Sequence, residues 1–177
     1  MKRKDIKNKL KEYFFLYPTI KLRVRQMERE LKVPLPSVIR YTKELEQEGI
    51  VKKEVIAGVT LFSSQRASQQ YLLEKIIHNF RSLYTSGLVE YLQEHLDRPA
   101  IILFGSYSRG EDTEKSDIDL YIQTPITRTP PVDKFEKELN RNIQIFQHKK
   151  FKEIENKFLR NNIINGLPIC GKVEVFT

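Results

Sequence analysis

The chain has 177 residues, of which 40% are hydrophobic and 31% charged, and its formal net charge is +8. This length accommodates one large domain or two small ones. The single cysteine, Cys170, excludes an intramolecular disulfide, and no apolar run approaches the ~20 residues of a membrane-spanning helix. Because the residues after Met1 also lack the apolar core of a signal peptide, we expect a soluble cytoplasmic protein without a membrane partner.

The positive charge is concentrated in the first third of the chain. Residues 1–66 contain 16 lysines and arginines against 8 aspartates and glutamates, whereas residues 67–177 contain 15 of each. A basic block of this kind is typical of a protein that binds a polyanion, although a basic surface that serves only solubility is the alternative. The asymmetry predicts a domain that ends near residue 66.

Helical spacing of apolar residues predicts three helices in this first third. The first ends before Pro18, the second spans Val24–Leu31, and the third runs from about Pro36 to Glu48. Two short strands, 50–56 and 59–62, follow as a hairpin.

Three helices followed by a hairpin resemble a winged helix-turn-helix domain, and the segment from Arg25 to Val51 is similar to prokaryotic regulators of that type. The resemblance implies that the third helix enters the major groove of duplex DNA and that the hairpin, the wing, contacts the DNA backbone. The candidate DNA-binding residues are Ser37, Arg40, Tyr41 and Lys43 on the helix and Lys52 and Lys53 on the wing. A winged helix that contacts only proteins is the alternative, because the third helix also carries three glutamates.

Residues 67–85 are predicted to form a connecting helix. Seven apolar residues at helical spacing form a wide stripe along it, namely Leu72, Leu73, Ile76, Ile77, Phe80, Leu83 and Tyr84. Such a stripe has to be covered, either by the chain's own domains or by a second copy of the chain. A homodimer is one of these two interpretations, and it would suit a DNA site with two-fold symmetry.

Alternating helices and strands are predicted for residues 86–177. The expected elements are a helix at Ser86–Leu96 capped by Ser86, strands at Ala100–Phe104 and up to Gln123, a proline-rich loop, a helix at 132–139, a strand at 142–147, one helix from Phe151 to Ile163, and an extended tail from Ile169 to Phe176. This order indicates a small α/β layer, so the fold class of the whole chain is α/β (α+β).

The centre of this second half combines two features that suit phosphate chemistry. A turn at Gly105 and Ser106 follows the apolar strand, and after ten further residues Asp117 and Asp119 open the next strand. Residues two apart on a strand share a face, so the two carboxylates form an oxygen-rich site suited to Mg²⁺. Gly105 permits close approach of a ligand, and the amides after it can bind phosphate oxygens.

The order Gly105-Ser106, ten residues, then Asp117-x-Asp119 resembles the signature of the polymerase-β-like nucleotidyltransferases, specifically of their minimal branch. The resemblance covers residues 86–177. It implies that Asp117 and Asp119 are catalytic and hold Mg²⁺, and that Gly105 and Ser106 hold the triphosphate of a nucleoside triphosphate (NTP). Arg109 is a further candidate for contact with the triphosphate, with a solvated arginine as the alternative.

The strand after the two aspartates departs from the family pattern. Competent members carry a third carboxylate there, which holds one metal ion and activates the attacking hydroxyl. Here the strand contains Gln144 and Gln147 and no acid, and a glutamine offers only a neutral carbonyl and no general base. Glu174, between apolar residues near the C-terminus, is a candidate replacement ligand for the metal or else an exposed acid on an edge strand.

These patterns predict Mg²⁺-dependent transfer of a nucleotidyl group from an NTP to an unidentified acceptor hydroxyl. The resemblance leaves open whether the acceptor is a small molecule, a tRNA end, or a tyrosine or similar hydroxyl on a partner protein. Minimal members often act as antitoxins, so a toxin-like partner protein is one option. The alternative function is a DNA-binding regulator whose transferase domain binds nucleotide but is catalytically weak or inactive.

Overall fold

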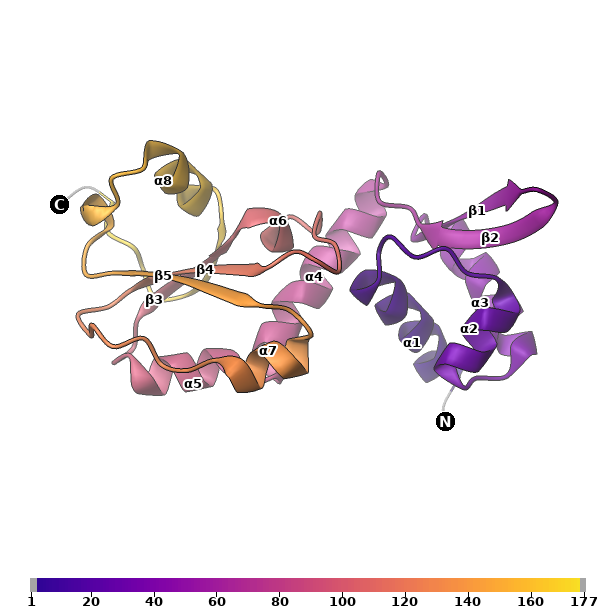
Figure 1. The fold of residues 1–177 in the computed structure, drawn as a ribbon, viewed down its shortest axis with the longest axis horizontal. Coiled ribbons are helices and arrows are strands. Elements are labelled where there is room, and N and C mark those ends of the chain that lie inside the picture. Colours follow the sequence, from indigo (N-terminus) through magenta and orange to yellow (C-terminus); the bar gives the residue numbers. More distant parts are fainter. Residues whose placement is uncertain (1–2, 176–177) are drawn as a thin grey trace. The chain divides into compact units, whose positions relative to one another are not determined.

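A computed structural model describes residues 3–175 of the chain (Figure 1). The chain forms two units, Met1–His78 and Asn79–Thr177. Their boundary lies inside helix α4 (Gln69–Thr85). The predicted connecting helix is therefore present, but its two halves belong to different units.

The first unit contains the three helices and the hairpin that the sequence predicts. These elements are α1 (Arg3–Leu16), α2 (Val24–Leu31), α3 (Leu35–Gln47), β1 (Val51–Ile56) and β2 (Val59–Ser64). The strands pair antiparallel around a two-residue turn at Ala57 and Gly58, both of which have positive φ, as hairpin turns of this length require. An isolated bridge joins Leu22 to Phe62 of β2.

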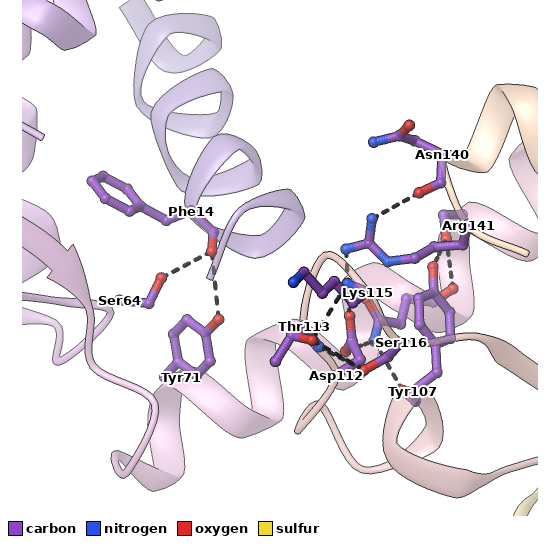
Figure 2. A network of polar contacts seen from close by, with 12 residues as sticks. Phe14, Ser64, Tyr71, Tyr107, Asp112, Thr113, Lys115, Ser116, Asn140 and Arg141 are labelled. Atoms are coloured by element: carbon purple, nitrogen blue, oxygen red, sulfur yellow. Dashed lines mark hydrogen bonds and ion pairs between the residues drawn. The ribbon is translucent and has the colours of Figure 1, made fainter. Parts of the chain in front are cut away.

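One hydrophobic core holds the first unit together. It contains residues from every helix, among them Leu10, Met27, Val38 and Leu45, all with 0% exposure. At the end of α1 the carbonyl oxygen of Phe14 accepts hydrogen bonds from Ser64 Oγ (2.9 Å) and Tyr71 Oη (3.4 Å), as Figure 2 shows. These two bonds satisfy a carbonyl that the helix itself leaves without a partner.

The second unit is built on a four-stranded sheet in the order β5-β4-β3-β6. Its elements are α5 (Leu88–His95), β3 (Ala100–Phe104), α6 (Gly105–Ser108), β4 (Ile118–Gln123), α7 (Asp133–Leu139), β5 (Ile143–His148), the 3₁₀ helix η1 (Phe151–Glu153), α8 (Lys157–Ile164) and β6 (Leu167–Cys170). Strands β4 and β5 are parallel, whereas β3 pairs antiparallel with β4 and with β6.

The two faces of this sheet pack against different helices (Figure 1). Helices α5 and α7 cover one face, where Ile118, Leu120 and Ile122 of β4 are buried. On the other face Tyr121 lies in a smaller cluster with residues of η1 and α8. Because side chains alternate along a strand, Asp119 shares this second face with Tyr121.

Three predicted elements differ from the observed ones. The single helix expected from Phe151 to Ile163 is divided into η1 and α8, because the Asn156 side chain accepts hydrogen bonds from two backbone amides and starts a new helix. The N-cap of α5 is Gly87, although Ser86 Oγ does accept a bond from Leu88 N (3.4 Å). The expected tail begins instead as strand β6, and Phe176 lies outside the described residues.

Within residues 3–175, no helix is long and apolar enough to span a membrane.

Candidate functional site

The two aspartates lie at the edge of the sheet where β3 ends and where β4 and β5 begin. Asp119 pairs in register with Phe104 of β3 on one side and with Gln144 of β5 on the other. Asp117 lies just before β4 and accepts hydrogen bonds from Gln144 Nε2 (2.6 Å) and from Asn142 Nδ2 (3.3 Å). The strand register therefore brings both predicted carboxylates together, with two amide side chains beside them.

Gly105 lies directly against the second aspartate. Its φ is +72°, a conformation that side-chain-bearing residues rarely adopt, and a Cβ atom there would lie 2.1 Å from Asp119 Oδ2. Glycine is thus required at this position both for the backbone conformation and for the space. The single-turn helix α6 begins at Gly105, so the amides of Gly105 and Ser106 have no partner within that helix. The predicted phosphate turn and the predicted metal carboxylates are adjacent.

The electrostatics of the pair suit a cation. Partial burial, followed by the negative charge of Asp117, raises the pKa of Asp119, while the positive charge of Arg109 opposes that rise. Arg109 itself is exposed, and its Nε donates to Glu111 Oε2 (2.8 Å). Because carboxylate oxygens are the ligands that Mg²⁺ prefers, these two side chains fit one divalent cation, which would relieve their mutual repulsion.

A third acidic ligand is not found beside the aspartates in the described part of the chain. Residues 3–175 contain no group of three His, Cys, Asp or Glu side chains placed to share a metal ion. Gln144 occupies the position opposite Asp119, whereas Gln147 pairs with Ile122 and its Nε2 donates to the Ile126 carbonyl (2.6 Å). Gln144 is therefore the residue of this strand that faces the candidate metal site.

The structure does not bring Glu174 to the aspartates. Strand β6 runs antiparallel to β3, and Cys170 pairs with Ile101 at the start of β3. The chain therefore leaves the sheet at the edge opposite the one that holds Gly105. Glu174 follows as an exposed residue between two half-buried valines, so the prediction that it replaces the third carboxylate gains no support.

A buried polar cluster, which the sequence did not reveal, lies behind the segment that joins Gly105 to Asp117. Asp112 and Arg141 are 1% and 2% exposed and form an ion pair of 3.7 Å (Figure 2). Asn79 Nδ2 donates to Asp112 Oδ1 and to the carbonyl oxygen of Tyr107, both at 2.8 Å. Burial also raises the pKa of the Tyr107 phenol to about 12, so it stays neutral. These contacts connect the loop to α4 and to the start of β5 and thereby position Asp117.

A cavity of about 370 Å³ adjoins Asp117 on the β5 side. All of its lining residues are polar or charged: Glu114, Lys115, Ser116, Asp117, Asp133, Glu136, Lys137, Asn140, Arg141 and Asn142. The cavity therefore offers a hydrogen-bonding approach to the candidate metal site.

The candidate DNA-binding residues of α3 do not all face solvent. Arg40 and Lys43 are exposed and Ser37 is half-buried, but Tyr41 is only 6% exposed. The prediction that Tyr41 binds DNA gains no support, because Tyr41 lies three residues from Val38 on the inward face of the helix and packs in the core. Arg40 is held along its own helix, since its Nε donates to Glu44 Oε1 (2.9 Å) and its guanidinium lies 5.1 Å from the centre of the Tyr41 ring.

Lys52 and Lys53 of the predicted wing are exposed but differ in their surroundings. Lys52 Nζ forms an ion pair with Glu54 Oε1 (2.6 Å), and Lys21 Nζ pairs with the other oxygen of the same carboxylate (2.6 Å). Hydrogen bonds from Lys21 and Lys52 lower the pKa of Glu54 to about 2. Lys53 has no ion pair with any described residue.

Residues 86–173 match the family model of the nucleotidyltransferase domain. This segment contains the predicted phosphate turn, both aspartates and Gln144, so the chain carries a nucleotidyltransferase domain where the motif predicted one. No curated protein and no solved structure matches the chain.

Proposed function

We propose that the second unit binds an NTP together with Mg²⁺ and transfers its nucleotidyl group to an acceptor hydroxyl. The observation that carries this proposal is that Gly105 lies directly against Asp119 Oδ2, so close that a Cβ atom at position 105 would lie 2.1 Å from it. A phosphate seat and a cation site at this separation can bind the two components of one Mg²⁺–triphosphate complex. The family match supports nucleotidyl transfer in general terms.

In this proposal the side chains have separate roles. Asp117 and Asp119 hold the cation, the amides at Gly105 and Ser106 bind the phosphates, and Arg109 contributes positive charge on the same side. Bound Mg²⁺ would neutralise the charge that develops on the transferred phosphoryl group. The acceptor oxygen forms its bond to the α-phosphorus as the bond to the leaving pyrophosphate breaks, and the proton of the acceptor hydroxyl leaves to water.

The order of the strands supports one route by which an acceptor would enter in this proposal. The phosphate turn follows β3, the carboxylates lie on β4, and the polar cavity lies beside β5 and α7. In-line displacement keeps the attacking and leaving oxygens on opposite sides of phosphorus. If the leaving phosphates lie on the β3 side, the acceptor hydroxyl would approach from the cavity. Asp117 belongs both to the lining of this cavity and to the candidate metal site.

A second candidate function is supported by Gln144. Its amide donates to Asp117 where the family pattern expects a carboxylate, and an amide cannot take the proton of the acceptor. The domain would then bind nucleotide and act as a sensor for a DNA-binding regulator, or as an antitoxin-like partner of a toxin-like protein, with weak or absent turnover.

One experiment separates these two functions. The chain is incubated with Mg²⁺ and ATP, GTP, CTP or UTP labelled at the α-phosphate, alone and with cell extract. Covalent label on any acceptor supports transfer, whereas nucleotide retained on the protein without label on an acceptor supports the sensor. Absence of both binding and transfer for all four NTPs would contradict both functions.

We also propose that residues 1–66 are a winged helix-turn-helix domain that binds duplex DNA. The element order and the charge of +8 in this segment support the proposal. Ser37, Arg40 and Lys43 would face the groove, and Lys52 and Lys53 would face the DNA backbone.

In gel shifts with the full chain, Arg40→Ala should reduce discrimination between duplexes of different sequence, and Lys53→Ala should weaken binding to all duplexes equally. Lys52→Ala should have the smaller effect, because Glu54 already pairs with Lys52. Equal binding by all three variants and the wild type would contradict these assignments.

A homodimer through α4 is a related proposal. Leu73 and Ile77 lie one turn apart and are 53% and 45% exposed, so a second copy could cover them. Light scattering should then show a dimer that Leu73→Glu with Ile77→Glu converts to a monomer, whereas a monomeric wild type would contradict the proposal.

A further inference from the structure

Exposed cations gather along α2 in the first unit. Arg25 and Arg29 lie four residues apart and share one helix face, and Arg29 Nε donates to the Arg25 carbonyl (3.3 Å). Lys32 follows seven residues after Arg25 at the C-cap of the same helix. Lys9 of α1 joins them, because its Nζ donates to the Leu31 carbonyl (2.8 Å), next to Lys32. We refer to Lys9, Arg25, Arg29 and Lys32 as the α2 ridge.

The α2 ridge differs from Arg40 of α3 and from Lys52 of the wing in how its charges are paired. Among the side chains that the structure describes, those of residues 6–175, none of its four cations forms an ion pair with a carboxylate, although all four are exposed. Arg40 and Lys52, by contrast, are bound to Glu44 and Glu54. A cation that is already paired with a carboxylate must give up that contact before it binds a phosphate, whereas in the ridge only Lys9 and Arg29 hold contacts, and these are hydrogen bonds to neutral backbone carbonyls.

The net charge of the two helices points in the same direction when their flanking cap residues are included, namely Arg23 and Lys32 for α2 and Glu48 for α3, although the residues inside the helix bounds are neutral in both. Residues 23–32 contain four cations and two glutamates, a net charge of +2, whereas residues 35–48 contain two cations and three glutamates, a net charge of −1. Helix α3 also exposes 53% of the apolar side chain of Ile39. A polyanion therefore meets a more favourable potential at α2 than at α3.

We propose that the α2 ridge supplies the main phosphate contacts when the chain binds duplex DNA. The inference rests on the proposed duplex binding and assigns its affinity to a surface outside the predicted groove helix and wing. From Arg25 to Lys32 the helix rises about 10 Å, a length over which each DNA strand carries about three phosphates. The guanidinium groups of Arg25 and Arg29 suit phosphate oxygens, because their donors form a planar fork.

The test measures how salt weakens binding of the full chain to a 20-base-pair duplex of arbitrary sequence. Fluorescence anisotropy gives the binding constant at NaCl concentrations from 50 to 200 mM. Each lost phosphate contact reduces the slope of log K against log salt by about 0.9. Arg25→Gln with Arg29→Gln should therefore flatten the slope by about 1.8 and weaken binding at 50 mM at least about tenfold. Arg25→Lys with Arg29→Lys keeps both charges and should retain the slope.

Two matched variants separate location from net charge. Lys149→Gln with Lys150→Gln removes the same two charges from exposed positions of the second unit and should leave the slope as in the wild type. Arg40→Gln with Lys43→Gln removes two charges from α3 and should flatten the slope less than the α2 variant does. Circular dichroism confirms that each variant is folded.

The outcomes test the proposed role of the α2 ridge separately from the duplex binding on which that role depends. A wild-type slope in the folded α2 variant, or a larger loss in the α3 variant, would overturn the ridge while leaving duplex binding in place. If the wild-type chain binds no duplex at 50 mM NaCl, duplex binding itself is wrong and the role of the ridge is wrong with it.

Discussion

Replacing Gln144 by glutamate should place a third carboxylate beside Asp117 and Asp119. Gln144 Nε2 lies 2.6 Å from Asp117 Oδ2. Because glutamine and glutamate side chains have nearly the same volume, the new carboxylate should lie within about 4 Å of the Asp117 carboxylate. Two like charges at about this distance repel by about 1 kcal/mol in water and about 4 kcal/mol near a protein surface. Without Mg²⁺ we therefore expect a loss of about 1–4 kcal/mol in the free energy of unfolding, and each kcal/mol lowers Tm by about 2–4 °C.

Magnesium should reverse this loss, because the added oxygen ligand strengthens cation binding as the cation relieves the repulsion. A carboxylate near the acceptor can also take its proton, an effect that typically contributes about 10²–10⁴-fold to a rate. Thermal unfolding with and without Mg²⁺, and transfer of α-labelled nucleotide with cell extract, measure the two effects. Gln147→Glu is the control, since it adds the same charge but its side chain contacts the Ile126 carbonyl. A Gln144→Glu variant with the wild-type Tm in both conditions and the wild-type transfer rate would refute the assignment.

The remaining predictions concern the acids themselves. Asp117→Asn with Asp119→Asn should abolish Mg²⁺-dependent NTP affinity in a folded protein, and unchanged affinity in calorimetry would contradict the metal site. Because burial and Asp117 raise the pKa of Asp119, its ionised form destabilises the fold; Asp119→Asn without Mg²⁺ should therefore raise Tm at pH 7. The difference in Tm between the variant and the wild type should disappear as the pH falls through the raised pKa of Asp119 to the unfolded-state value of about 3.9. Equal Tm values for the variant and the wild type at pH 7 would contradict this prediction. Glu174→Gln should leave transfer unchanged, and a loss of transfer would show that the third ligand is misplaced.

Strong apolar periodicity was enough to predict several elements. The predicted bounds of α2 (Val24–Leu31) and β3 (Ala100–Phe104) are the observed ones. The division between η1 and α8 was missed because the apolar spacing continues across it. Asn156, a favourable N-cap residue, was the signal that could have shown the break.

The core of the candidate site was predictable because it depends on residues close together in the chain. Asp119 lies on β4 and Asp117 directly before it, and the turn after β3 places Gly105 against Asp119. The pair of Asp112 and Arg141 is different, since these residues are far apart in sequence and meet only through the folded sheet. No local spacing could have indicated that contact.

The hydrogen bonds at Asp117 bear on which function the second unit performs. Two carboxylates of like charge repel one another, and the amides of Asn142 and Gln144 offset part of that repulsion when no cation is bound. A carboxylate at position 144 would instead increase the repulsion and make the folded site depend on metal. The amide at this position thus lets the site stay formed without nucleotide, at the expense of a proton acceptor for the attacking hydroxyl. Under the sensor proposal this balance would allow reversible binding of Mg²⁺ and NTP without rapid turnover, and the Gln144→Glu comparison tests that proposal against transfer most directly.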